Sequence, residues 1–259
     1  MSSECCKTGF NWTATPTGTE TTITASLTTP SSTINTYVTG SSKTAALLMI
    51  HDIFGWTFSN LRILADQFAE ELGVTVFLPD FFDGEVVDPS TLEDPVKREK
   101  FNIPEFIGRN SKEIRFPAME AVARKLKQDY GKVATIGYCY GAWACLQLSA
   151  LTTSPTSTSP TPLIAATSIA HPSLLTPAEL DAVRSPLQII APEHDPAFTP
   201  DLKKYANEVV PTLGVAYEYI YFPGLTHGFA AKGDRGDEAQ RKGLEKARRD
   251  AVGFLGEFL

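Results

Sequence analysis

The sequence predicts an α/β fold in which a mostly parallel sheet is covered by helices on both faces. From about residue 45 onward, short apolar runs alternate with longer amphipathic stretches. The apolar runs are unbroken, as in strands that are buried on both faces of a parallel sheet. Strands that alternate with helices form βαβ units with right-handed crossovers.

The elements follow one another in this order along the chain. Residues 1–44 are an N-terminal extension, and the Thr-rich part from 13 to 44 has alternating apolar positions that favour an antiparallel edge pair. The predicted strands of the main sheet cover residues 45–50, 74–78, 132–137, 163–170, 186–191 and 215–222. The predicted helices cover residues 60–72, 111–130, 201–210 and 241–258, with Gly73 and Gly131 as stop signals.

Two stretches interrupt this alternation. Residues 83–110 contain Pro89, Pro95 and Pro104 among mixed charges and fit no periodic element, so we expect a lid-like insertion. Residues 152–162 are rich in Ser, Thr and Pro, which predicts a solvated surface loop. A chain of 259 residues with one continuous pattern is expected to form a single domain over residues 1–259.

Composition excludes several classes of function. The net charge is -7 and no Lys/Arg-rich block occurs, so we expect no nucleic-acid partner. No apolar run reaches the roughly 20 residues of a membrane span, and the N-terminus lacks the apolar core of a secretory signal. We therefore expect a cytoplasmic protein with reduced cysteines. The cysteines include no C-x-x-C pair, which argues against a metal site. The sequence leaves the oligomeric state open, a homodimer included.

The sharpest local motif is Gly-Tyr-Cys-Tyr-Gly at residues 137–141. It follows the buried run 132–137 and precedes a helix-like segment. This strand–turn–helix context is typical of the nucleophile elbow of α/β-hydrolases, with Cys139 in place of serine. Glycines flank the nucleophile because larger side chains would collide with the neighbouring strand and helix. The motif therefore predicts a cysteine nucleophile at a helix N-terminus, where the dipole favours a thiolate.

A cysteine nucleophile needs a base and an acid, which follow it in that fold in the order nucleophile, acid, histidine. Asp195 ends a predicted strand, and His227 follows the last one. Open α/β sheets place their reactive residues beyond the carboxyl ends of strands. We therefore expect a Cys139–His227–Asp195 triad, with Glu193 as the alternative acid.

The other histidines are expected to lie outside the triad. His51 precedes the nucleophile, and we expect it to line the pocket at most. His171 precedes the acid, and we expect a capped or hydrogen-bonded core histidine there. His194 is adjacent to Asp195 and is expected to point elsewhere.

Acyl transfer also needs hydrogen-bond donors for the oxyanion. We expect the backbone N–H groups of Tyr140, which follows the nucleophile, and of Ile53, in the loop after the first buried strand. The side chains expected to line the substrate pocket are Asp52, Phe54, Trp56, Phe82, Tyr138 and Phe229. Core packing is the alternative for the aromatic members of this set, since aromatic side chains dominate both kinds of surface.

Four motifs together resemble the dienelactone hydrolase family. They are His-Asp-Ile-Phe-Gly-Trp at 51–56, Gly-Tyr-Cys-Tyr-Gly at 137–141, Glu-His-Asp at 193–195 and Thr-His-Gly-Phe at 226–229. The resemblance is to fungal-type members, which also begin with a short segment like Cys5-Cys6. It implies a single α/β-hydrolase domain, no cofactor, a small-molecule lactone or ester substrate, and Cys139, Asp195 and His227 as nucleophile, acid and base.

Two positions depart from the bacterial members of that family. Those proteins carry a glutamate where this chain has Asp52, and an arginine four residues after the catalytic histidine, where this chain has Ala231 followed by Lys232. Lysine lacks the bidentate fork of arginine, so the sequence does not single out the dienelactone as substrate. A thioesterase or lactone-processing enzyme of secondary metabolism, and a non-catalytic binding protein on the same fold, remain alternatives.

Overall fold

The computed structural model describes residues 12–26, 32–89, 91, 94–154, 161–234 and 236–259. Within these residues an eight-stranded sheet has the order β1-β2-β4-β3-β5-β6-β7-β8. The two pairings of β2, with β1 and with β4, are antiparallel, and all pairings from β4 to β8 are parallel. The predicted mostly parallel sheet is thus confirmed. The strands are β1 (Thr19–Ala25), β2 (Ser32–Thr39), β3 (Ala45–Ile50), β4 (Thr75–Pro79), β5 (Lys132–Tyr138), β6 (Thr167–Ala170), β7 (Leu187–His194) and β8 (Tyr217–Thr226).

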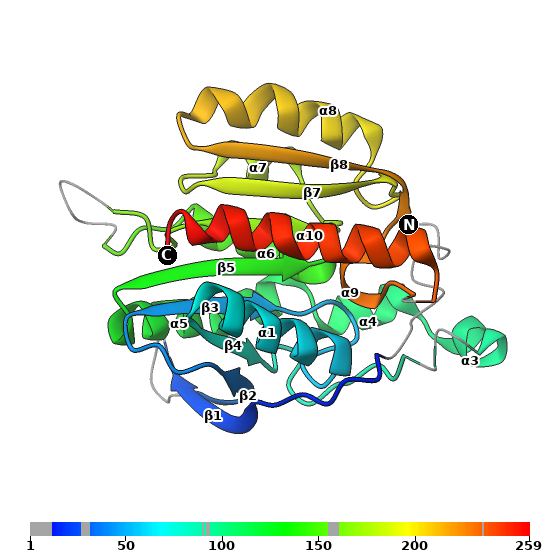
Figure 1. Cartoon of the computed structure of the whole chain (residues 1–259), viewed down its shortest axis with the longest axis horizontal. Coiled ribbons are helices and arrows are strands. Elements are labelled where there is room, and N and C mark those ends of the chain that lie inside the picture. Colours follow the sequence, from blue (N-terminus) through cyan, green and yellow to red (C-terminus); the bar gives the residue numbers. More distant parts are fainter. Residues whose placement is uncertain (1–11, 27–31, 90, 92–93, 155–160, 235) are drawn as a thin grey trace.

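Helices cover both faces of this sheet (Figure 1). On one face α1 packs against α10, and on the other α5 packs against α6. No helix in the described part of the chain is long and apolar enough to cross a membrane. The helices are α1 (Ser59–Leu72), α3 (Pro95–Lys100), α4 (Ile103–Arg109), α5 (Lys112–Asp129), α6 (Tyr140–Ser149), α7 (Pro177–Asp181), α8 (Pro200–Val209), α9 (Phe229–Lys232) and α10 (Glu238–Gly256), with a short 3₁₀ turn at Val210–Leu213.

The ends of α1 and α5 show where the local sequence does and does not determine how a helix ends. Gly73 ends α1 in the left-handed conformation with φ 65°, as its position predicts. Gly131 does not play this role, because α5 already ends at Tyr130, whose backbone is extended with φ -124°. The chain therefore enters β5 directly, without a left-handed turn.

The N-terminal extension adds the two edge strands and an anchor. β1 and β2 form the predicted antiparallel pair. Before them, the Trp12 backbone N–H donates to Asn60 Oδ1 at 2.9 Å, and Trp12 Nε1 donates to the Gly233 carbonyl at 3.3 Å. Asn60 Nδ2 in turn donates to the Ala231 carbonyl at 3.2 Å. This anchor joins residue 12 to α1 and to α9. Cys5 and Cys6 lie outside the described residues.

The insertion at residues 83–110 contains two short helices, α3 and α4, where the sequence pattern indicates no regular element. Their six and seven residues are too few to display a periodic stripe. α4 begins instead because of its capping residues. Asn102 Oδ1 accepts the Glu105 N–H at 3.1 Å, and Pro104 occupies the first turn. The stretch predicted as a surface loop is described only at its ends, where Thr152 and Pro162 form an isolated bridge.

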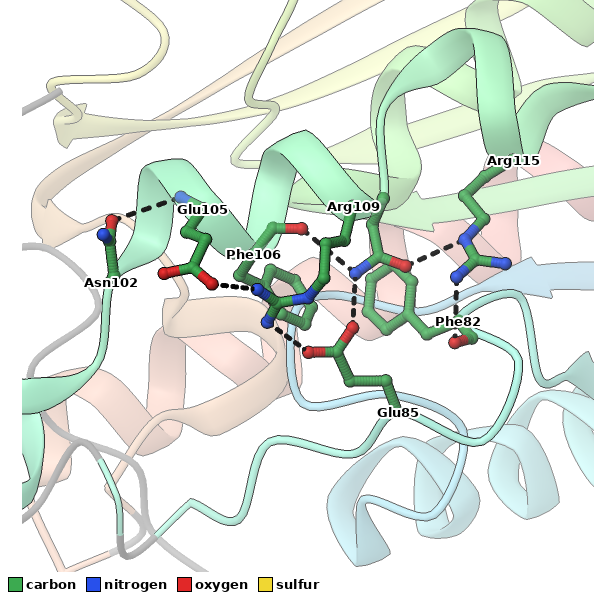
Figure 2. A network of polar contacts seen from close by, with 8 residues as sticks. Phe82, Glu85, Asn102, Glu105, Phe106, Arg109 and Arg115 are labelled. Carbon is green, nitrogen blue, oxygen red and sulfur yellow. Dashed lines mark hydrogen bonds and ion pairs between the residues drawn. The ribbon is translucent and has the colours of Figure 1, made fainter.

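A polar network joins the two ends of this insertion (Figure 2). Arg109 bridges Glu85 and Glu105, with N···O distances of 2.7 Å to each. The buried Asn110 donates from Nδ2 to Glu85 at 3.0 Å and accepts at Oδ1 from Arg115 Nε at 2.8 Å. The network also reaches the main domain, because the Tyr140 hydroxyl donates to the Asn110 carbonyl at 2.7 Å.

Candidate active site

Cys139 lies in a strained turn between β5 and α6, with φ 48° and ψ -107°. A Cβ on Gly141 would lie 2.2 Å from the Ile50 carbonyl oxygen, and one on Gly137 would lie 2.6 Å from the Gly141 carbonyl oxygen. Both distances are shorter than real contacts, so glycine is required at both positions. The turn aims Cys139 at the carboxyl edge of the sheet, next to the N-terminus of α6. This is the geometry of a nucleophile elbow.

Asp195 and His227 meet at the same edge. Asp195 directly follows β7, His227 directly follows β8, and both oxygens of Asp195 lie 2.9 Å from His227 Nδ1. The carboxylate is itself held in place, because its Oδ1 accepts the backbone N–H groups of Ala197 and Phe198 at 2.8 and 3.0 Å. Such an arrangement fixes the imidazole with Nδ1 protonated and leaves Nε2 for the thiol.

The pKa of His227 reflects these neighbours. Burial lowers it, but the negative charges of Cys139 and Asp195 and hydrogen bonds to both side chains outweigh burial, so the pKa lies well above its ordinary value. Cys139, His227 and Asp195 thus form an electrostatically coupled relay of three side chains.

The alternative acid, Glu193, does not contact His227. It accepts the Gly224 N–H at 2.7 Å at the protein surface. The side chain of His194 is 64% exposed, as expected for a residue that points away from the site. Asp195 is therefore the carboxylate that orients His227.

The loop after β3 adds a carboxylate beside the triad. Asp52 is 3% exposed, and its Oδ1 accepts the Phe54 N–H at 2.9 Å. Burial raises the pKa of Asp52 to about 7, although the Phe54 N–H and the positive charges of Lys232 and His227 oppose the rise. Asp52 therefore titrates near neutral pH, and it lies close enough to His227 for the charge of His227 to lower its pKa.

His51, next to Asp52, is a structural residue of this loop. Its Nδ1 lies 2.8 Å from the Asp52 carbonyl oxygen, and its Nε2 accepts the Phe81 N–H at 3.2 Å. Burial lowers the pKa of His51 to about 4, against the hydrogen bond to Asp52. The neutral ring therefore carries its proton on Nδ1 and ties the loop after β3 to the chain after β4.

The segment after β6 contains two residues whose contact with this site the sequence pattern did not indicate. Ser173 Oγ lies 3.6 Å from Cys139 Sγ, and its N–H donates to the Cys139 carbonyl at 3.0 Å. His171 packs its ring against His227, with centroids 5.1 Å apart. The expectation of a hydrogen-bonded core histidine at 171 is wrong, because neither ring nitrogen has a partner among the described residues. The one available signal was the position of both residues after a buried strand.

The remaining predicted site residues lie around the triad or behind it. Tyr140 begins α6, whose first N–H groups lack intrahelical partners, and Ile53 lies in the loop after β3. Tyr138 and Phe229 flank His171, with ring centroids 5.9 and 6.0 Å away. The three other aromatic residues are buried against other rings or a cation: Phe54 against Phe58, Trp56 under Arg62, and Phe82 between His51, Phe106 and Tyr140.

Comparison with known proteins decides the family. The model of the dienelactone hydrolase family matches residues 34–259. The chain belongs to the dienelactone hydrolase family. Hydrolase tropI of Talaromyces stipitatus is 28% identical and covers 100% of this chain and 97% of its own. A carboxymethylenebutenolidase homolog of Rattus norvegicus is 30% identical, over 87% of this chain and 88% of its own.

Solved structures confirm the α/β-hydrolase fold. A dienelactone hydrolase from Anabaena variabilis superposes with a TM-score of 0.63 at 15% identity, covering 93% of this chain and 99% of its own. Carboxyl esterase 2 of Tuber melanosporum gives a TM-score of 0.65 at 14% identity, covering 98% and 91%. This dienelactone hydrolase family member is a hydrolase of the ester- and lactone-cleaving class, and its substrate is a small molecule.

Lys232 is a buried cation of this dienelactone hydrolase family member whose charge acts on the site. It is 7% exposed at the end of α9, and its charge lowers the pKa of both Asp52 and His171. Its side chain covers Gly228, where a Cβ would lie 2.2 Å from Lys232 Cε. Gly228, with φ 86°, is favoured directly after His227 by its backbone, and any larger residue there would also have to displace the Lys232 side chain.

Proposed function

We propose that this enzyme hydrolyses a carboxylic ester or lactone through an acyl-enzyme on Cys139. The observation that carries the proposal is the relay itself: Cys139 in a strained elbow, His227 close enough for Cys139 to raise its pKa, and Asp195 2.9 Å from His227 Nδ1. Each group has the position that nucleophilic catalysis requires.

In the first half-reaction the Cys139 thiolate attacks the acyl carbon. The carbonyl oxygen becomes an oxyanion that the N–H groups of Ile53 and Tyr140 stabilise. The ester C–O bond then breaks, and the departing alkoxide takes a proton from His227. In a lactone substrate the alkoxide stays attached to the acyl group by its own carbon chain.

In the second half-reaction His227 removes a proton from water, which attacks the thioester carbon. The C–S bond breaks, the carboxylic acid leaves, and Cys139 returns to the thiolate paired with protonated His227. The whole cycle consumes one water and needs no group beyond the side chains named. We infer that residues 83–110 control access, because the Tyr140 hydroxyl joins the elbow to this insertion at Asn110.

The same proposal favours a reducing compartment such as the cytoplasm. Cys139 and Cys145 are both free thiols within the described residues, and a catalytic thiolate has to stay reduced to react.

Acyl thioesters are a second substrate class with the same chemistry at the acyl carbon, so a thioesterase is the alternative that the assay below includes.

The experiment is hydrolysis of p-nitrophenyl acetate, an aromatic δ-lactone, the dienelactone and an acyl thioester by wild type, Cys139→Ser and Cys139→Ala. We expect wild type to cleave at least one oxygen ester, and Cys139→Ala to lose roughly 10³-fold or more in turnover. Acylation trapped on Cys139 and located by mass spectrometry would support the covalent step. Turnover by Cys139→Ala at the wild-type rate would sink the proposal, and an unreactive Cys139 with no turnover would favour a binding protein.

A further inference from the structure

His171 lies beside the nucleophile because of how two strands pair. The register of β5 and β6 sets Tyr138 opposite Ala170, so the next residues along each strand, Cys139 and His171, are neighbours. Backbone hydrogen bonds fix both sides of the nucleophile: Cys139 N–H donates to the Ala170 carbonyl at 3.1 Å, and Ser173 N–H donates to the Cys139 carbonyl at 3.0 Å. His171 is thus part of a short segment that wraps around Cys139.

The ring of His171 is enclosed by the site. It is fully buried, and it packs edge-on against His227 at 5.1 Å and 64° between Tyr138 and Phe229. Neither Nδ1 nor Nε2 has a hydrogen-bond partner in any other residue that the structure describes; the one polar contact of the ring is with its own backbone. Its backbone is also strained, with φ 39° on a residue that is not glycine.

Both features destabilise the folded protein. A buried polar atom without a partner has lost its bonds to water and gained none, and a left-handed backbone is unfavourable for histidine. Phenylalanine would fill the same space between the same rings without unpaired nitrogens. A polar group held at such a disadvantage beside reacting groups indicates that its partner arrives during the reaction.

We propose that His171 is a further residue of the active site, which hydrogen-bonds an oxygen at the reacting centre: an oxygen of the acyl group or the attacking water. The proposal rests on the proposed function. Neutral imidazole offers one donor and one acceptor, so it can serve either oxygen. Burial, followed by the positive charges of His227 and Lys232, holds the pKa of His171 well below its ordinary value and keeps both capabilities at neutral pH.

For His171 to act, a substrate that reaches the triad must also reach the ring of His171. Cys139 is only 6% exposed and His227 only 3%, so a substrate that reaches Sγ has to displace the groups that cover them. Because the His171 ring contacts the ring of His227, the proposal requires that the same displacement also uncovers its nitrogens.

The test is His171→Phe in stopped-flow hydrolysis of p-nitrophenyl acetate, where the burst reports acylation and the steady state reports deacylation. We expect one phase to slow by about tenfold or more, the effect of one lost hydrogen bond of ordinary strength, at an equal or higher Tm. A slowed burst assigns the bond to the acyl group, and a slowed steady state assigns it to water. Unchanged rates in both phases overturn the proposal, and so does a large fall in Tm, which would mean that the nitrogens have partners in the fold.

Two further sets of variants make the result specific. The amide of His171→Asn stands in for Nδ1 and that of His171→Gln for Nε2, so partial rescue by one of them identifies the nitrogen at work. Ser185→Ala is the matched control, because Ser185 Oγ is also buried without a partner but lies before β7, at the opposite end of that strand from Asp195. We expect this control to keep both rates; an equal loss there would contradict the specific role.

Cys139→Ala in the same assay separates this proposal from the proposed function. If wild type shows no acylation or Cys139→Ala keeps it, the acyl-enzyme mechanism fails whatever His171 does. If Cys139→Ala is inactive and His171→Phe is fully active, only the role of His171 fails.

Discussion

The loops after β3 and after β6 each hold a buried histidine at the carboxyl edge of the sheet, and the two rings are held in opposite ways. His51 uses both nitrogens, one toward the Asp52 carbonyl and one for the Phe81 N–H. His171 uses neither within the described residues. Burial lowers the pKa of both, so both are neutral. The two rings therefore differ in their partners and not in their charge.

The residues near the two rings also differ in their polar partners and in their backbone conformation. On the side of His51, the Phe82 ring that it contacts packs against Phe106, and the polar network next to Phe106 is paired: Asn110, fully buried, bonds to Glu85, Phe106 and Arg115 (Figure 2). The backbone of His171 itself is strained, with positive φ like that of Cys139, whereas His51 is not among the described non-glycine residues with positive φ. We infer that the paired ring of His51 holds the fold and that the unpaired, strained ring of His171 serves the reaction.

The largest expected effect on stability comes from His51→Phe. The variant leaves the Phe81 N–H buried without its acceptor and removes one of two donors to the Asp52 carbonyl, which keeps the Gly55 N–H at 3.2 Å. We expect the free energy of unfolding to fall by about 2–4 kcal/mol. Urea denaturation of His51→Phe beside His171→Phe is the direct measurement, since only the first should be destabilised. Equal stability of the two variants would remove the contrast between the loops.

A smaller effect concerns Asp52, whose pKa is raised from 3.8 to about 7 by burial. Between these two values the folded protein binds more protons at this site than the unfolded chain does, so stability falls as pH rises from about 4 to 7. Asp52→Asn removes this loss, and we expect its stability to rise relative to wild type by up to about 1.4 kcal/mol per pH unit across that range. Denaturation curves at several pH values measure it, with the exposed Asp201→Asn as control. A constant difference between wild type and Asp52→Asn would show that Asp52 is ionised throughout.

The smallest effect is expected at the outer layer of the insertion network. Arg109 is half exposed where it bridges Glu85 and Glu105. Arg109→Ala should therefore cost less than about 1 kcal/mol of stability, with a difference from wild type that shrinks in high salt. A salt-independent loss as large as that of His51→Phe would place Arg109 among the groups that hold the fold.

The sheet and the relay could be predicted because their signals are local. The unbroken apolar run 45–50 forms β3, and Gly137 and Gly141 mark the elbow by the space that they leave. Asp195 and His227 were identified by strand ends and by order along the chain. The structure adds the contact between them and excludes Glu193 as the carboxylate that orients His227.

The environment of His171 could not be predicted, because strand pairing between β5 and β6 sets it and no local pattern records that pairing. The order rule for the triad placed His171 outside the site, although its ring touches His227. The helices α3 and α4 were missed for a different reason, since a cap and a proline start α4 without any periodic stripe. Short helices of this kind depend on single residues and not on a pattern.

Trp12 has a practical consequence for anyone who attaches this enzyme to a support. Its two hydrogen bonds, with that of Asn60, fasten the start of the described chain to Ala231 and Gly233, just beyond His227. Pulling on that end, or trimming it past Trp12, loosens α9 beside the reactive edge. The opposite end leaves through α10 and finishes at Leu259, at the other end of that helix from α9 (Figure 1). An immobilised or fused biocatalyst is therefore best tethered through its C-terminus.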